Sequence, residues 1–198
     1  MADLILASAS PRRQELLKQI GVHFVCLPMN IDESPLKNEG PHAFVTRLAE
    51  EKTLAALPQA KGLAVLGSDT IVTIDNQILG KPKNSTDAKK ILSLLSARTN
   101  VVMTGVSICQ VINGQTKMLT KVVSTEVKFL PLSQKQIAAY VKTGEPMDKA
   151  GAYGIQGLAA VFIESINGCY SNVVGLPLAQ TGQLLEQFNV PVWQPNSN

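Results

Sequence analysis

The sequence predicts a mixed α/β fold, in which a sheet carries helices on its faces. Short apolar runs typical of strands alternate along the chain with segments whose apolar residues recur at helical spacing. Residues 101–129 are rich in β-branched side chains, and an Asn-Gly pair at 113–114 predicts a hairpin there. The 198 residues, 45% of them hydrophobic, are enough to bury a sizeable core. Since no repeat or linker interrupts them, we expect one domain over 1–198.

The N-terminal part of the chain begins with two strands that flank a helix. The run "DLILAS" predicts a buried strand, and "SPRRQELLKQIG" predicts a helix capped by Ser10, with Pro11 in its first turn and Gly21 at its exit. The segment "VHFVCLPMN" predicts the next strand, and the polar "IDESPLKNEGP" predicts a loop before the helix "HAFVTRLAEEKTLAALP". These patterns place the first helix directly after a buried strand.

The rest of the chain continues the alternation. The segment "LAVLGSDTIVTIDNQILGKP" predicts a strand, a functional loop and a second extended piece, with "DN" as the turn. Further helices are expected in "DAKKILSLLSAR", capped by Ser85 or Thr86, in "LSQKQIAAYVKTG", capped by Ser133, and in "LPLAQTGQLLEQF". Between the last two, "AAVFIESINGCYSNVVG" predicts a strand, a turn and a loop.

Charge and cysteine content argue against several classes of protein. The formal net charge is only +3 and the basic residues are scattered, so we expect no nucleic-acid partner. Cys26, Cys109 and Cys169 lack the spacing of a zinc or redox motif and are expected to be small buried side chains in a reducing compartment. No signal-peptide pattern and no run of 18 apolar residues occurs, so we expect a cytoplasmic protein without a membrane span.

The segment "ASASPRR" at 7–13 is a candidate phosphate site. A turn from a strand into a helix presents backbone N–H groups at the positive end of the helix dipole, and anions bind there. Ser8 and Ser10 would add hydroxyl donors, and Arg12 or Arg13 would add charge and forked hydrogen bonds. The alternative is an ordinary capped helix whose two arginines are solvated.

Three further positions have side chains suited to phosphate chemistry. Asp69 follows an apolar strand and can hold a divalent cation or accept a proton from water, unless it only forms a turn. Lys81 in "GKP" can stabilise charge on a phosphoryl group, although a surface lysine beside a turn is the simpler interpretation. Gln156 lies between two glycines in "YGIQGLA", which can admit a flat ligand or merely form a tight bend.

Together these motifs resemble the Maf family of nucleoside triphosphate pyrophosphatases. The resemblance rests on "SASPRR", Glu33, "RLAEEK", "GSDTIV", "GKP", "YGIQG" and "NVVGLPL", in this order, and spans Leu4 to about Phe188, so the tail 189–198 lies outside it. It implies an elongated mixed sheet with two lobes and a cleft between them, similar to the inosine triphosphate pyrophosphatases. It also implies a homodimer that cleaves a nucleoside triphosphate between its α and β phosphates with Mg²⁺ or Mn²⁺.

The resemblance also assigns roles to individual residues. It puts the proton acceptor at Asp69, a metal ligand at Glu33, and phosphate-facing side chains at Ser8, Arg13, Lys52 and Lys81. Because binding a cation lowers the basicity of a carboxylate, we expect Asp69 to act first as base and second as metal ligand, and Glu33 the reverse.

Three positions place the chain with the family members that prefer dTTP and UTP. These are Arg12, Thr70 and Gln156, where the branch acting on 7-methyl-GTP carries an aromatic residue, Gln and Glu. Gln156 can donate and accept at once, which suits the edge that uracil and thymine share. Two alternatives stay open: the same enzyme with another base, such as a modified pyrimidine or CTP, and a nucleotide-binding regulator of septum formation.

Overall fold

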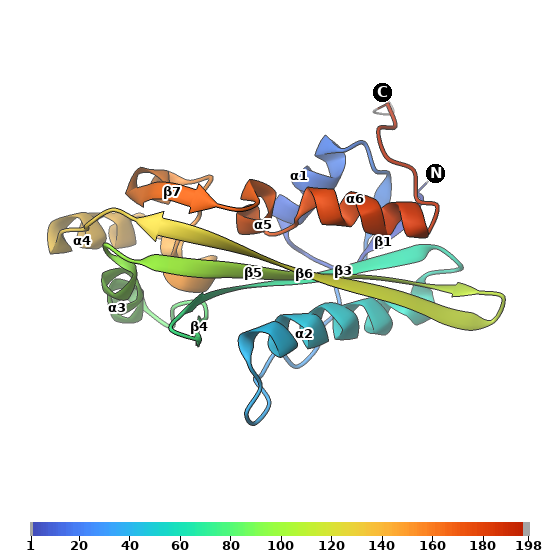
Figure 1. The fold of residues 1–198 in the computed structure, drawn as a ribbon, viewed down its shortest axis with the longest axis horizontal. Coiled ribbons are helices and arrows are strands. Elements are labelled where there is room, and N and C mark those ends of the chain that lie inside the picture. Colours follow the sequence, from blue (N-terminus) through green and yellow to red (C-terminus); the bar gives the residue numbers. More distant parts are fainter. Residues whose placement is uncertain (1, 196–198) are drawn as a thin grey trace. The chain divides into compact units, whose positions relative to one another are not determined.

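The computed structural model describes residues 2–195, and Figure 1 shows its elements. Within these residues the strands form one seven-stranded sheet in the order β2-β1-β3-β5-β6-β7, with β4 paired to β3. The strands are β1 (Leu4–Leu6), β2 (Phe24–Cys26), β3 (Ala64–Ile74), β4 (Gln77–Leu79), β5 (Thr99–Ile112), β6 (Gln115–Phe129) and β7 (Ile163–Asn167). The helices are α1 (Pro11–Gln19), α2 (Pro41–Ala56), α3 (Ser85–Leu95), α4 (Gln134–Lys142), α5 (Tyr170–Val174) and α6 (Leu178–Gln187). The predicted mixed α/β class is therefore confirmed.

The chain divides into two compact units. Unit 1 comprises Met1–Asp69, Thr104–Val123 and Gly175–Asn198, and unit 2 comprises Thr70–Met103 and Ser124–Val174. Strands β3, β5 and β6 each pass from one unit into the other. The cleft and the single domain that the sequence led us to expect stay predictions.

Three strands of unit 1, β2, β1 and β3, are parallel. β1 pairs in parallel with both β2 and β3, so its residues Leu4–Leu6 are buried on both sides. Helix α2 covers one face of the strands, and α1 and α6 lie over the other (Figure 1). Gly67 of β3 and Gly105 of β5 let α2 approach closely, because a Cβ at either position would collide with α2 backbone atoms. This close packing brings the side chains of α2 onto β3.

Helix α1 begins and ends where the sequence predicts, but its cap differs. Pro11 opens the helix, and Gly21 follows its end with a φ of +68°. Ser10 occupies the N-cap position, but its side chain makes no capping hydrogen bond. Instead, the hydroxyl oxygen of Ser8 accepts the Ser10 N–H at 3.2 Å. The predicted capping role of the Ser10 side chain is thus wrong.

The C-terminal tail hydrogen-bonds to the backbone at the C-terminal end of α1. The backbone N–H of Trp193 donates to the carbonyl of Ile20 at 2.7 Å, and that of Gln194 donates to Gly21 at 3.1 Å. A Cβ at Gly21 would lie 2.7 Å from the backbone of Gln194, so the close approach requires glycine there. The described part of the tail therefore ties down the C-terminal end of the helix that carries Arg12 and Arg13; residues 196–198 lie outside the described residues.

Unit 2 has its own core, in which helices α3 and α4 pack against one another. Phe129 is fully buried at its centre and meets the ring of Tyr153 edge-on at 4.9 Å. Helix α4 begins with the predicted Ser133 cap, which Gln136 completes as a capping box. Helix α3 is capped by Asn84, whose side chain accepts the Asp87 N–H, so the expected caps Ser85 and Thr86 lie one and two residues too late in the sequence.

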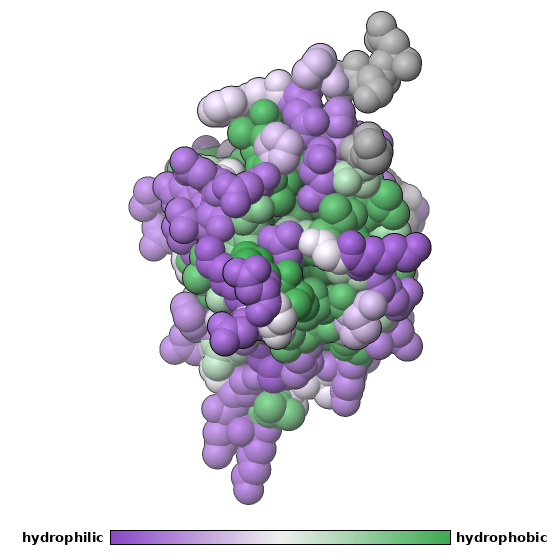
Figure 2. Space-filling view, turned by 90° about the vertical axis from the view of Figure 1, so that its right-hand side faces the viewer, coloured by the Kyte–Doolittle hydropathy of each residue, from purple (hydrophilic) through white to green (hydrophobic). Residues whose placement is uncertain are grey.

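Tight turns and a polar loop also follow the sequence. Asn113 and Gly114 both have positive φ angles, as the predicted hairpin between β5 and β6 requires. Asp75 and Asn76 form the equivalent turn between β3 and β4. The loop before α2, which hangs lowest in Figure 1, is almost entirely hydrophilic in Figure 2. No helix within residues 2–195 is long and apolar enough to cross a membrane.

Candidate functional site

Asp69 lies inside a continuous strand. The segment "GSDT", expected as a functional loop, is the middle of β3, which runs unbroken from Ala64 to Ile74. Successive side chains of a strand point to opposite faces, so Asp69 shares with Gly67 the face that α2 covers, and Thr70 points to the other. The loop prediction was therefore wrong, and the strand fixes the direction of the Asp69 carboxylate.

Lys52 joins two carboxylates in unit 1. Its ammonium, on α2, lies 2.7 Å from Asp69 Oδ1 and 2.6 Å from Glu33 Oε1. The side chains of Lys52 and Asp69 are only 11% and 12% exposed, whereas Glu33, on the loop before α2, is 55% exposed. Three residues assigned by resemblance thus meet in space, although 36 positions separate Glu33 from Asp69 in the sequence.

These carboxylates are the atoms of the site best suited to a hard cation. Glu33 and Asp69 each place one oxygen against the same ammonium, so these two oxygens are near neighbours in the site. No cluster of three or more His, Cys, Asp or Glu side chains suited to a metal occurs within residues 2–195. Magnesium sites that work on phosphates commonly use one or two carboxylates together with water and phosphate oxygens. The donor set fits that pattern.

Ser8 and Arg13 meet at the start of α1. The Arg13 Nη1 donates to Ser8 Oγ at 3.2 Å, and its Nε donates to the carbonyl of Gly175 at 2.9 Å. The "GLP" segment at 175–177 therefore anchors the guanidinium from the opposite end of the chain. Burial lowers the pKa of Arg13, while the Asp69 and Glu33 carboxylates act to raise it and Arg12 acts to lower it. Arg13 thus lies close enough to Asp69 and Glu33 to feel their charges, and its guanidinium stays charged.

The other predicted residues lie at the start of α1 and in unit 2. Arg12 is partly exposed beside Arg13, and Ser10 precedes it. In unit 2, Thr70 is partly buried in β3. Lys81 is exposed just after β4, where the carbonyl of Gly80 accepts the Gly151 N–H at 3.2 Å and so fixes the backbone of the "GKP" turn.

Gln156 is the third predicted residue in unit 2, and it lies at the tip of a turn. The Gly157 N–H donates to the carbonyl of Gly154 at 3.1 Å, which closes a four-residue turn around Ile155 and Gln156. The Gln156 side chain is exposed. The bend that the glycines predicted is therefore present.

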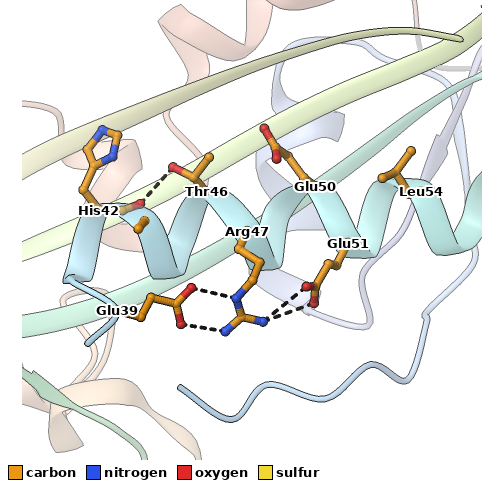
Figure 3. Close-up of a pocket in the computed structure, with 8 residues that line it drawn as sticks. Glu39, His42, Thr46, Arg47, Glu50, Glu51 and Leu54 are labelled. Atoms are coloured by element: carbon orange, nitrogen blue, oxygen red, sulfur yellow. Dashed lines mark hydrogen bonds and ion pairs between the residues drawn. The ribbon is translucent and has the colours of Figure 1, made fainter. Parts of the chain in front are cut away.

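Arg47 holds the loop that carries Glu33. Figure 3 shows its guanidinium between Glu39 and Glu51, with hydrogen bonds of 2.7 and 2.8 Å to the two Glu39 oxygens. A further bond of 3.0 Å reaches the carbonyl of Ser34, next to Glu33. Arg47 lowers the pKa of Glu39 to about 2. The residues drawn in Figure 3 line a cavity of about 510 Å³ along α2, and none of the predicted site residues lines it.

The sequence did not lead us to expect the contacts of Arg47 with Glu39, Glu51 and the Ser34 carbonyl, which we call the Arg47 clamp. The spacing of Arg47 and Glu51 is a helical i,i+4 pair and could have been recognised. Glu39 precedes the helix, and no local spacing rule connects a loop residue to a side chain eight positions later.

Comparisons with known proteins relate nearly the whole chain to one family. A model of the family described as Maf-like protein matches residues 3–188. The dTTP/UTP pyrophosphatase of Symbiobacterium thermophilum is 49% identical over 98% of this chain and 97% of its own. The dTTP/UTP pyrophosphatase of Shewanella denitrificans is 53% identical over 91% of this chain and 93% of its own. Among solved structures, the Ham1 protein of Staphylococcus aureus covers 67% of this chain and 88% of its own, with a TM-score of 0.44 and 16% identity. On the strength of the family match and of these close relatives, the chain belongs to the Maf family.

Proposed function

We propose that this protein is a nucleoside triphosphate pyrophosphatase that hydrolyses dTTP and UTP to the monophosphate and pyrophosphate. Two relatives that share about half of their residues with it over almost the whole chain are named for this activity. The observation that carries the proposal is the buried Lys52, ion-paired with both Asp69 and Glu33. A fixed ammonium beside two carboxylates is an arrangement suited to a polyphosphate, its metal and an attacking water.

A divalent cation, Mg²⁺ or Mn²⁺, would be held by Glu33 and Asp69. When bound, such an ion neutralises phosphate charge and polarises the phosphoryl group. Both carboxylates now bind Lys52, so ion and ammonium would share them, and the half-exposed Glu33 is the side chain with more freedom to turn toward an ion. This supports Glu33 as the principal protein ligand and leaves Asp69 for the water.

Asp69 would orient the attacking water and accept its proton. The water oxygen forms a bond to the α-phosphorus, the bond from that phosphorus to the bridging oxygen breaks, and pyrophosphate leaves with the bond electrons. Lys52 holds the Asp69 carboxylate in place at 2.7 Å and, with Lys81, offers positive charge to the phosphates. Ser8, Ser10 and Arg13 would bind phosphate oxygens at the start of α1, where the helix dipole also favours an anion.

Base preference would come from Arg12, Thr70 and Gln156. The exposed Gln156 amide can donate to and accept from the edge that uracil and thymine share. Another pyrimidine, such as CTP or a modified base, is the alternative substrate. The homodimer and the cytoplasmic location rest on the family resemblance and stay predictions.

Hydrolysis in ¹⁸O-labelled water tests the proposed reaction. With magnesium and UTP, the products should be UMP and pyrophosphate, and mass spectrometry should find the label in UMP, because water attacks the α-phosphorus. Label in pyrophosphate would place the attack on the β-phosphorus. Release of orthophosphate alone would show that a different bond is cleaved.

A further inference from the structure

The turn that presents Gln156 is built around a carboxylate from the same unit. Glu145 begins the short helix η2 (Glu145–Asp148), nine or more residues before the turn. Its Oε2 accepts the Leu158 N–H at 2.9 Å, and its Oε1 accepts the Ala159 N–H at 3.4 Å. The two residues that directly follow the turn are therefore attached to one side chain.

The same carboxylate is itself held in place. The Tyr140 hydroxyl, on α4, donates to Glu145 Oε1 at 3.0 Å. The Tyr140 ring packs edge-on against Phe162 at 5.2 Å, and Phe162 ends the helix η4 (Leu158–Phe162) that the turn leads into. In addition, the Lys149 ammonium donates to the Glu145 carbonyl at 2.7 Å. Contacts with Tyr140 and Lys149 therefore hold both the side chain and the backbone of Glu145 in place.

The two glycines of the turn have a physical reason to be there. A Cβ at Gly157 would collide with the Glu145 carboxylate, and a Cβ at Gly154 would lie 2.8 Å from Lys149 Cε. The φ of Gly157 is −105°, which any residue can adopt, so space and not backbone conformation requires glycine. The sequence left open whether these glycines admit a ligand or form a tight bend; in the structure the space beside Gly157 holds Glu145 and the space beside Gly154 holds Lys149.

We infer that Glu145 is a positioning residue that sets the place of the Gln156 amide and thereby the base preference. This inference rests on the proposed function, in which Gln156 contacts the base. An amide on a fixed turn can meet a base edge at one distance from the sugar, and pyrimidine and purine edges lie at different distances. If the turn were loose, the amide could move aside and make room for the larger purine. The preference for pyrimidine over purine would then fall although the amide is still present.

The experiment measures kcat/KM for UTP and for GTP in single and double variants. Gln156→Ala should lower the ratio of the two values about tenfold, the effect of losing one or two hydrogen bonds to the base. Glu145→Gln keeps the shape of the side chain but turns one acceptor oxygen into a donor that faces a backbone N–H. It should lower the ratio at least threefold, and amide hydrogen exchange at Leu158 and Ala159 should accelerate.

The double variant separates positioning from general damage. If Glu145 acts through Gln156, adding Glu145→Gln to Gln156→Ala should not lower the ratio further. Glu164→Gln is the matched control, because Glu164 is an exposed carboxylate of the same unit whose partner is Lys128, and its ratio should equal that of the unaltered protein. A merely structural role would lower activity on both nucleotides alike and leave the ratio unchanged.

Two milder variants cover the case in which Glu145→Gln does not fold. Tyr140→Phe removes one donor from the carboxylate and keeps the ring on Phe162, so it should lower the ratio in the same direction by a smaller factor. Gly157→Ala should push the carboxylate away and also lower the ratio, whereas Gly182→Ala, where a Cβ meets open space, should not.

The outcomes separate this inference from the proposed function. An unchanged ratio in the Glu145, Tyr140 and Gly157 variants, with Gln156→Ala effective, overturns the inference alone. An unchanged ratio in Gln156→Ala overturns the base-reading role of Gln156 and the inference with it. Absence of pyrophosphate release by the unaltered protein overturns the proposed function itself.

Discussion

Replacing Lys52 by Met should separate the stability of the site from its chemistry. The substitution keeps an unbranched side chain of similar length and removes the ammonium from between Asp69 and Glu33. Asp69 is 12% exposed, so its carboxylate would lose its ionic partner without gaining water. Breaking a buried ion pair in this way costs about 3–5 kcal/mol. Glu33 is largely solvated, and losing an exposed pair adds only about 0–1 kcal/mol.

We therefore expect the free energy of unfolding to fall by about 3–5 kcal/mol at pH 7 and most of that loss to come from Asp69. Activity should fall by roughly a hundredfold, the usual effect of losing one charged group that stabilises the transition state, or about 3 kcal/mol. Urea unfolding and the rate of pyrophosphate release from UTP measure the two effects. Lys90→Met, at an exposed position of α3, is the control and should change stability by no more than about 0.5 kcal/mol.

The double variant Lys52→Met/Asp69→Asn makes the test sharper. Removing both partners removes the uncompensated charge, so part of the lost stability should return, whereas activity should stay low because the proton acceptor is also gone. A Lys52→Met protein as stable as the Lys90→Met control would refute the electrostatic reasoning. A Lys52→Met protein that keeps its activity within twofold would refute the role of Lys52 in the chemistry.

Three further predictions concern the loop before α2 and the buried thiol. Arg47→Gln should raise the rate of proteolytic cleavage within residues 31–40 several-fold, because Glu39 and the Ser34 carbonyl lose their donor; Arg98→Gln, which breaks only an exposed pair, should not. The Glu39 carboxyl should titrate near pH 2 by NMR, and in Arg47→Gln its pKa should rise toward the ordinary 4.5. Because its folded pKa is lowered, its contribution to stability is complete above about pH 4.5 and is lost as the pH falls toward 2. A Glu39 titration midpoint near 4.5 in the unaltered protein would show that Arg47 does not bind Glu39. Burial raises the pKa of Cys109 to about 11, so at pH 8 this thiol should react with a thiol reagent only after unfolding, and rapid reaction in the folded protein would contradict its burial.

Local chemistry made part of the fold predictable from the sequence. The Asn113-Gly114 hairpin, the Pro11 start of α1 and the Ser133 capping box depend on residues within a few positions of each other, and the structure contains all of them. The strand through Asp69 was not predictable in this way. Gly, Ser and Asp favour turns, but the close approach of α2 and the pairing with neighbouring strands keep the segment extended.

The site shows the same division between local and long-range effects. No spacing rule connects Glu33, Lys52 and Asp69, and only the resemblance to a family put them forward together. Their meeting depends on how α2 lies on β3, which the sequence alone did not reveal. Glu145 was overlooked for the same reason, because its side chain binds backbone N–H groups that lie 13 and 14 residues further along the chain.

The most direct test of the central claim, that Asp69 activates the attacking water, is the turnover rate of Asp69→Asn at saturating UTP and magnesium. Asn keeps the size and one oxygen of the side chain but accepts a proton far less readily, and a general base contributes typically 10²–10⁴-fold to a rate. We predict that kcat falls by a factor in that range while the affinity for UTP changes less than about threefold. A variant that releases pyrophosphate at close to the normal rate would contradict the account.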